Sequence, residues 1–264
     1  MEKIKAVFFD IDGTLVPIGG RGVPADTRAS IEAVRSKGVK VFVCTGRHIV
    51  WVDNLGDMEF DGYVTVNGGM CLLGDRKTCI YRHDIDPGDI KRLASLSRDC
   101  ETPVAVVPAD GEIFINRIDD NVRRVAGGLN VDHIPEADIT TAIGKPVVQL
   151  MVFGTESERQ RSGIFSHALL HCRDISWSPW FCDVIPADSD KSNGIDRMAA
   201  HFGFSPEEAM AFGDGGNDIG MLRHVGIGVA MGNARKAVKE AADYVTAADN
   251  AGGIADAFRH FGLL

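Results

Sequence analysis

Short apolar runs recur along the chain, and most of them end at a turn rich in glycine, aspartate or asparagine. The first run, 4–9, is apolar at all but one position and stops at Asp10. This pattern is typical of a strand buried on both faces of a parallel sheet. The stretches between the runs carry helical signals, such as Pro24 near the start of 24–37 and Gly38 after its end. The expected strands are 4–9, 39–44, 62–67, 209–212 and 227–230.

Strand and helix alternate in this way at both ends of the chain, which predicts an α/β fold with a doubly wound parallel sheet covered by helices. Between about 82 and 186 the order changes to a helix, two short strands, a helix, a strand and a helix, followed by aromatic runs. This middle block has the pattern of an independent α+β domain. We therefore expect a core made of 1–82 and 186–264, whose halves share one sheet, and a second domain at 83–185.

The composition is that of a globular protein, with 264 residues of which 45% are hydrophobic and 25% charged. No stretch reaches the roughly 20 apolar residues of a membrane span, and the first apolar run ends too early for a signal peptide. We therefore expect a cytoplasmic protein with no membrane partner and no evident obligatory protein partner. The formal net charge of −9 argues against nucleic acid as a partner. The six cysteines are scattered without a CxxC pair, which favours reduced thiols.

The strongest chemical signal is the stretch Asp10-Ile11-Asp12-Gly13-Thr14, directly after the first strand. Two carboxylates two positions apart can both point into one crevice if the chain turns. Gly13 permits a sharp turn, and Thr14 can hydrogen-bond that turn. Ligands of open α/β sheets bind outside the carboxyl ends of the strands, where the strand order reverses. The stretch therefore predicts a functional site rather than a capped turn of acidic residues.

A second acidic stretch, Gly213-Asp214-Gly215-Gly216-Asn217-Asp218, also follows an expected strand. Asp214 and Asp218 are four residues apart, so a helix that begins in this loop would aim both at one point. Two carboxylates and an amide suit a hard, oxygen-seeking cation such as Mg²⁺. By itself the stretch is more typical of a surface turn, and it gains meaning from its pairing with the first. It is no dinucleotide fingerprint, because no GxGxxG follows the first strand.

Two weaker signals complete the pattern. Thr45 ends the second strand, and its hydroxyl together with the Gly46 amide could bind an anion at the start of the next helix. Lys191 begins a helix directly after the middle block, where a lone lysine is usually solvated. At that position it would balance several carboxylates and a bound phosphate. Arg47 could reach a substrate or cap a helix, and the residues alone leave both roles open.

In this order, the four pieces resemble the motifs of the haloacid-dehalogenase-like (HAD) phosphohydrolase superfamily. The resemblance covers both core segments, about 160 residues, and implies a Rossmann-like HAD core. The middle block is similar to the α/β cap of the Cof-type branch, which hydrolyses sugar phosphates and other small phosphate esters. Thr45-Gly46-Arg47 and Asn67-Gly68-Gly69 resemble that branch as well. One position departs from the family, since Ser192 follows Lys191 where the family often has glycine.

The resemblance implies a Mg²⁺-dependent phosphatase whose substrate is a small phosphorylated metabolite, most of all a sugar phosphate. Asp10 would be the nucleophile that forms an aspartyl-phosphate, and Asp12 would be the general acid and base. Mg²⁺ would be held by the Asp10 carboxylate, by Asp214 and by the backbone carbonyl of Asp12. The resemblance further implies phosphate binding by Thr45, Gly46, Lys191 and Asn217, and support of the site by Asp218 and Arg47.

Three other functions are compatible with parts of the pattern. A sugar phosphomutase would use the same aspartyl-phosphate but return the phosphate to a sugar. A phospho-receiver switch also clusters aspartates and a lysine at strand ends, but it needs neither Asp12 nor a long insertion. A silent binding protein would be expected to have lost motif residues, and none is lost. In the middle block, Trp177, Trp180 and Phe181 could line a substrate or form that domain's own core.

Overall fold

The chain folds into two compact units in the computed structural model, which describes residues 4–98, 100–110, 112–129 and 133–264. One unit joins the chain up to Arg82 with Asp190–Leu264, and the other is His83–Ser189. The sequence places the second edge near 186, and the first unit resumes at Asp190. Among the described residues, every helix is too short or too polar to cross a membrane.

The first unit is built on an eight-stranded sheet with the order β13-β12-β11-β1-β2-β3-β4-β5. The six strands from β13 to β3 are parallel, and β4 and β5 extend the sheet as an antiparallel edge that the sequence pattern did not indicate. The strands are β1 (Ala6–Phe9), β2 (Lys40–Cys44), β3 (Gly62–Thr65), β4 (Met70–Leu73), β5 (Cys79–Arg82), β11 (Ala209–Gly213), β12 (Ile227–Ala230) and β13 (Tyr244–Val245).

The strand order of this sheet reverses beside β1. From β1 the chain runs outward through β2 and β3, and after 83–189 it returns to β11 on the other side of β1. Both ends of the chain therefore contribute to one sheet, which confirms the predicted doubly wound α/β core. The reversal places the carboxyl ends of β1 and β11 next to each other, and these are the ends that carry the two acidic loops.

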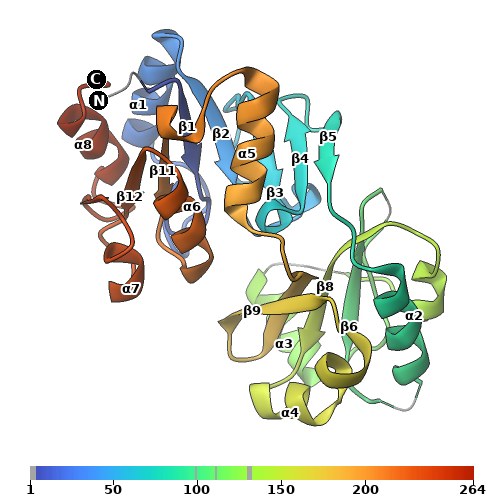
Figure 1. Ribbon diagram of the computed structural model, residues 1–264. Helices are drawn as coiled ribbons and strands as arrows, with labels where there is room; N and C mark the ends of the chain where they lie inside the picture. The colour runs from blue at the N-terminus through green and yellow to red at the C-terminus, as the bar shows by residue number, and fades with distance from the viewer. Residues whose placement is uncertain (1–3, 99, 111, 130–132) are drawn as a thin grey trace. The chain divides into compact units, whose positions relative to one another are not determined.

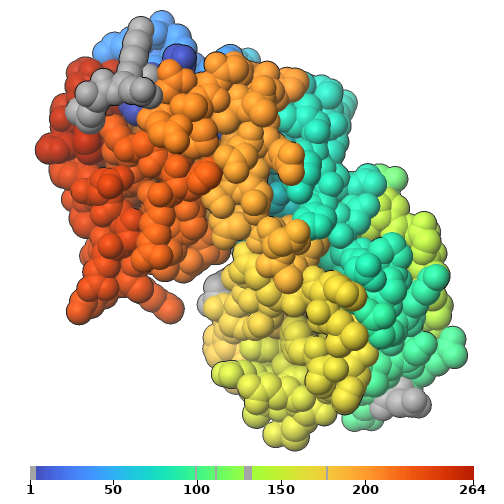
Figure 2. Space-filling view, in the orientation of Figure 1, coloured from blue at the N-terminus to red at the C-terminus, as the bar shows by residue number. Residues whose placement is uncertain are grey.

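Helices cover both faces of this sheet (Figure 1): α1 (Ala25–Ser36), α5 (Lys191–Phe202), α6 (Ile219–His224), α7 (Lys236–Lys239) and α8 (Gly253–His260). Side chains of β1 alternate between the faces. Val7 and Phe9 belong to one buried cluster with α1 and α8, whereas Ala6 and Phe8 belong to another with α5 and α6. Burial on both faces explains why the run is apolar at successive positions. In the space-filling view, the orange segment that includes α5 and α6 covers much of this face of the unit (Figure 2).

The unit His83–Ser189 has its own antiparallel sheet with the order β7-β6-β8-β10-β9. Its strands are β6 (Val104–Pro108), β7 (Phe114–Ile115), β8 (Val147–Phe153), β9 (Cys172–Ser178) and β10 (Phe181–Pro186). Its helices are α2 (Pro87–Leu96), α3 (Asp120–Leu129) and α4 (Glu156–Arg161), with a single π-helical turn at Ile164–Ala168. Apolar residues of α2, the π-helical turn, β6, β8 and β10 form one buried cluster, so this unit has a core of its own.

The aromatic residues near the β9–β10 turn differ in their surroundings. Phe181 is buried and stacks on Phe153 with ring centroids 5.7 Å apart, so it packs inside this unit, although both rings lie outside the buried cluster described above. Trp180 is partly exposed, and the Arg124 guanidinium lies over its ring at 4.2 Å. The side chain of Trp177 lies outside the described part of the chain. For Phe181, the structure favours the core interpretation over a substrate wall.

Candidate active site

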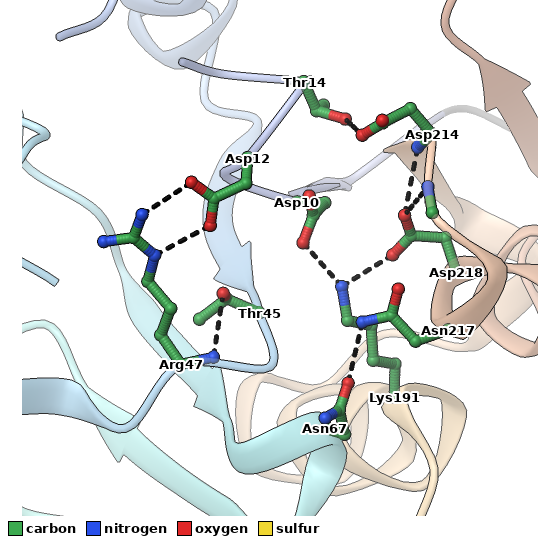
Figure 3. Close-up of polar contacts among 11 residues, drawn as sticks. Asp10, Asp12, Thr14, Thr45, Arg47, Asn67, Lys191, Asp214, Asn217 and Asp218 are labelled. Atoms are coloured by element: carbon green, nitrogen blue, oxygen red, sulfur yellow. Dashed lines mark hydrogen bonds and ion pairs between the residues drawn. The ribbon is translucent and has the colours of Figure 1, made fainter. Parts of the chain in front are cut away.

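The two acidic loops lie side by side at the carboxyl ends of β1 and β11. The strands run parallel with Phe9 opposite Phe212, and the Asp10 N–H donates to the Phe212 carbonyl at 3.0 Å. Asp10 and Asp214 therefore leave the sheet at the same edge. Because the strand order reverses here, this edge is the crevice in which open α/β sheets bind ligands. Figure 3 shows polar side chains from both loops gathered at this edge of the sheet.

Lys191, the first residue of α5, lies between two carboxylates. Its Nζ is 2.6 Å from Asp10 Oδ1 and 2.6 Å from Asp218 Oδ1, and its side chain is fully buried. Burial alone would lower the pKa of Lys191, but the charges of Asp10 and Asp218 raise it above its usual value. Lys191 therefore stays an ammonium ion. Desolvation of a buried ion costs several kcal/mol, which close and well-aligned partners must offset.

The loop after β11 is shaped by the carboxylate of Asp218. Its Oδ2 accepts the backbone N–H groups of Asp214 at 3.0 Å and of Gly215 at 2.8 Å. A Cβ at Gly213 would lie 2.5 Å from the Asp218 Cβ, so this close approach requires glycine. From the first loop, the Thr14 hydroxyl donates to Asp214 Oδ1 at 3.0 Å. Both loops therefore orient the side chain of Asp214.

Negative charge exceeds positive charge in the centre of the crevice. Asp10, Asp214 and Asp218 each place a carboxylate oxygen within 4.8 Å of the others, and the ammonium of Lys191 stands against these three charges. Burial raises the pKa of Asp10 well above its usual value, although Lys191 opposes the shift. Burial and then the charge of Asp218 raise the pKa of Asp214 to about 6. In both aspartates burial is the main cause of the raised pKa, and the positive charge of Lys191 does not cancel it.

The donor set of this cluster fits a hard divalent cation. Asp10 Oδ1 is occupied by Lys191 and Asp214 Oδ1 by Thr14, whereas the Oδ2 atoms of both aspartates accept no hydrogen bond from any described residue. Gly13 has a φ of +85°, and a Cβ there would lie 2.4 Å from Asp214 Oδ2. Glycine at position 13 therefore leaves the space beside Asp214 Oδ2 free of a side chain. Clustered carboxylate oxygens are the ligands that Mg²⁺ takes in proteins.

Asp12 points away from this cluster and toward Arg47 (Figure 3). Arg47 donates from Nε to Asp12 Oδ2 at 2.7 Å and from Nη2 to Oδ1 at 2.6 Å. Its Nη1 donates to the Trp51 carbonyl at 2.9 Å, and its backbone N–H donates to Thr45 Oγ1 at 3.1 Å. Burial alone would lower the pKa of Arg47, but the contact with Asp12 raises it. Arg47 therefore caps the short 3-10 helix Ile49–Trp51 and also forms a bidentate pair with Asp12.

Comparison with known proteins agrees with this geometry. The family model described as haloacid dehalogenase-like hydrolase matches residues 7–258. The chain belongs to this family. YkrA of Bacillus subtilis (strain 168), whose name gives it provisionally as a phosphatase, is 31% identical over 261 residues and covers 98% of both chains.

Two solved HAD structures are similar over the whole length. The subclass IIB sugar phosphatase BT4131 is 39% identical with a TM-score of 0.87, covering 98% of this chain and 100% of its own. The phosphatase BT1666 from Bacteroides thetaiotaomicron is 32% identical with a TM-score of 0.89, covering 99% and 96%. The protein is thus an enzyme of the HAD family, and a phosphatase.

The structure of this HAD phosphatase brings the predicted site residues into one crevice, with Asp12 and Arg47 as a pair at its side (Figure 3). A lone lysine at the start of a helix is usually solvated, but the structure buries Lys191 completely. Gly46 lies beside Thr45, and a Cβ on it would be 3.0 Å from Asn67 Nδ2. The catalytic and phosphate-binding roles of these residues stay predictions.

Asn67 lies beside the candidate site residues, although the sequence analysis gave it no role. Its buried amide Oδ1 accepts from Asn217 Nδ2 at 2.8 Å. Asn67 and Val66 both lie in the left-handed region, with φ of 51° and 54°. This is an outlier for a β-branched residue, and such strain costs about 1–3 kcal/mol. The expected strand 62–67 is therefore too long, because β3 ends at Thr65, and the Asn67-Gly68 pair is the sequence signal that could have predicted this turn.

A second group of potential metal ligands, Asp86, Asp89 and His171, lies in the unit His83–Ser189. The buried Asp89 carboxylate accepts from Arg92, from the His171 backbone N–H at 2.9 Å and from Cys172 Sγ at 3.4 Å. His171 Nδ1 also lies 2.9 Å from it. Its oxygens are therefore occupied, and Arg92 supplies a positive charge. We interpret this group as a structural link between α2 and β9.

We expect Asp214→Asn to stabilise the metal-free enzyme at pH 8, because it removes a charge that burial and Asp218 disfavour. The folded pKa of about 6 lies above the ordinary value of 3.8, so the destabilisation is present above pH 6 and fades as the pH falls toward 4. The gain in Tm should therefore shrink at pH 4.5. Mg²⁺ should raise the Tm of the unaltered enzyme but not that of the variant. A variant no more stable at pH 8 in EDTA would contradict this account.

Gly13→Ala should be far more disruptive than Gly38→Ala, although the two glycines have φ of +85° and +88°. Gly38 has no atom within 4 Å of an added Cβ, so its alanine costs only backbone strain, about 1–2 kcal/mol. At Gly13 the Cβ would collide with Asp214, which should cost about 1–3 kcal/mol more and weaken Mg²⁺ binding. Urea unfolding and Mg²⁺ titration measure both effects. Equal effects of the two alanines would refute the predicted collision.

Proposed function

We propose that this enzyme hydrolyses small phosphate monoesters, sugar phosphates above all, with Mg²⁺ and through an aspartyl-phosphate on Asp10. Asp10 carries the proposal, because its buried carboxylate lies at the switch point of the sheet with one oxygen held by Lys191 and the other free of donors from described residues. The similarity to a sugar phosphatase that is 39% identical supports the substrate class.

In the first step, an oxygen of Asp10 attacks phosphorus and the bond from phosphorus to the alcohol oxygen breaks. Asp12 gives its proton to that departing oxygen, and the phosphoryl group stays on Asp10. A carboxylate nucleophile divides one difficult displacement into two easier ones. Protonation of the leaving oxygen contributes about 10²–10⁴-fold, because an alkoxide leaves poorly.

In the second step, water attacks the phosphorus of the aspartyl-phosphate and Asp12 takes a proton from it. The bond from phosphorus to Asp10 breaks, which releases inorganic phosphate and restores the Asp10 carboxylate. Asp12 ends this step protonated, ready for the next substrate. During both steps, the phosphoryl oxygens would be held by the ammonium of Lys191, the hydroxyl of Thr45, the backbone amide of Gly46 and the side-chain amide of Asn217.

The excess of negative charge explains why a divalent cation belongs to this proposal. A phosphate dianion 4 Å from each carboxylate would meet repulsion of about 4 kcal/mol per pair of unit charges at an effective dielectric of about 20. The ammonium of Lys191 alone does not offset this repulsion. Asp10, Asp214 and the Asp12 carbonyl would hold Mg²⁺, which when bound neutralises charge on the phosphoryl oxygens.

We infer that the unit His83–Ser189 serves as the cap domain of the enzyme. It is inserted between the two halves of the core, and it has its own sheet and its own buried cluster. An independently folded insertion of this kind can vary its side chains without disturbing the catalytic sheet. Selectivity for the alcohol part of the substrate would therefore reside in this unit.

Asp10→Asn should lower kcat by about 10⁴-fold or more, because an amide oxygen is a poor nucleophile toward phosphorus. Release of inorganic phosphate from a hexose phosphate measures the rate. The matched control is Asp57→Asn, which alters an exposed aspartate paired with Arg28 and should retain full activity. A well-folded Asp10→Asn enzyme with undiminished turnover would refute the nucleophile.

Removal of metal with EDTA should abolish phosphate release, and added Mg²⁺ should restore it, because the cluster at Asp10 and Asp214 lacks compensating charge. Ca²⁺ should restore much less activity, since it takes more ligands in a looser geometry. Undiminished turnover in EDTA would exclude the metal. Conversion of a hexose phosphate into its isomer without release of phosphate would instead favour the phosphomutase.

A further inference from the structure

The side chain of Asp12 needs a second residue to fix its direction. It is 55% exposed, in contrast to Asp10, whose side chain is 10% exposed and held by Lys191. A carboxylate that is open to water samples several rotamers, and proton transfer requires hydrogen-bond reach of one particular oxygen. Among the described residues, the hydrogen bonds to the Asp12 carboxylate come from Arg47.

Arg47 restrains both oxygens of Asp12 at once. Nε bonds to one oxygen at 2.7 Å and Nη2 to the other at 2.6 Å, the geometry in which a guanidinium plane and a carboxylate plane align. Each carboxylate oxygen keeps a second lone pair outside this pair of bonds. The contact therefore fixes the direction of Asp12 without occupying all of its capacity for hydrogen bonding.

Arg47 is itself held in place from behind. Its Nη1 donates to the carbonyl of Trp51, at the end of the short helix Ile49–Trp51. That helix is bound in turn by Arg76, whose Nη2 donates to the carbonyls of Ile49 and Val52. A positioning residue transmits order only if its own rotamer is locked, and this chain of contacts locks it.

The same residue also touches the proposed phosphate site, but through its backbone. The N–H of Arg47 donates to Thr45 Oγ1 at 3.1 Å. A substitution of the Arg47 side chain leaves this backbone bond in place and removes only the contact with Asp12. The two contributions of Arg47 can therefore be separated by experiment.

We propose that Arg47 is the positioning residue of Asp12, which fixes the direction of the Asp12 carboxylate by a two-point contact. The inference rests on the proposed function, in which Asp12 protonates the leaving oxygen. It has a chemical consequence, because the need for a proton depends on the leaving group. The alcohol of a sugar phosphate needs one, whereas p-nitrophenolate leaves without it. Loss of the orientation should therefore harm the first substrate and largely spare the second.

The test compares kcat/KM for a hexose 6-phosphate and for p-nitrophenyl phosphate, since this parameter covers only the steps up to the aspartyl-phosphate. Arg47→Met should lower it about 100-fold or more for the sugar ester and less than about tenfold for the aryl ester. Arg47→Lys should behave similarly, because an ammonium lacks the planar fork. Arg28→Met, which breaks an Arg–Asp pair with Asp57 outside the motifs, should change neither value.

A double variant adds a second measurement. If Arg47 acts through Asp12, then Arg47→Met should cause little further loss for the sugar ester in an Asp12→Asn background. Any of four results would overturn the inference. The first two are equal losses of kcat/KM for both esters and no loss for either ester. The other two are full activity of Arg47→Lys and additive losses in the double variant. The outcomes also separate the two proposals, because an active Asp10→Asn enzyme refutes the proposed function, whereas an unchanged ratio in Arg47→Met refutes only the role of Arg47.

Discussion

A buried ammonium ion between two carboxylates determines how this site is built. Lys191 comes from the start of α5, Asp10 from the end of β1 and Asp218 from the loop after β11, so the two ion pairs join three distant parts of the chain. Loss of the ammonium would leave two buried carboxylates uncompensated, and loss of either carboxylate would leave the ammonium with one partner. Breaking such a pair typically costs about 3–5 kcal/mol. The local order of the crevice therefore depends on all three segments being in place together.

The other charged side chains of the site are arranged around the ammonium of Lys191. Arg47 satisfies Asp12 at the side of the crevice, which leaves the ammonium of Lys191 to serve the carboxylates in the centre. The pKa values of Asp10 and Asp214 are raised mainly because both carboxylates are buried, and the charge of Lys191 does not cancel this effect. The centre of the site has more carboxylates than cationic groups, and two of its carboxylate oxygens accept no hydrogen bond from a described residue. Such a site suits a divalent cation and a phosphate together better than either ligand alone.

The two clusters of potential metal ligands in this enzyme show why composition alone does not identify a metal site. Around Asp89, arginine, histidine and cysteine side chains supply the hydrogen bonds and the charge that the buried carboxylate requires. Among the described residues, hydrogen-bond donors reach only one oxygen of the Asp10 carboxylate and only one oxygen of the Asp214 carboxylate. A carboxylate whose oxygens are all occupied contributes to stability, and one with an unoccupied oxygen can accept a ligand.

The sequence by itself determined the alternation of strands and helices, the joining of both chain ends in one sheet, and the placement of Asp10, Thr45, Lys191 and Asp214 at element ends. These features follow from local periodicity, because burial on both faces makes a strand apolar throughout and a turn after it needs glycine and short polar residues. Only the tertiary structure decided that Lys191 is buried, that Arg47 pairs with Asp12, that Asn67 reaches Asn217 and that β4 and β5 extend the sheet. Each of these depends on contacts between residues far apart in the chain, and the geometry of such contacts is set by packing rather than by any pattern in the neighbouring residues.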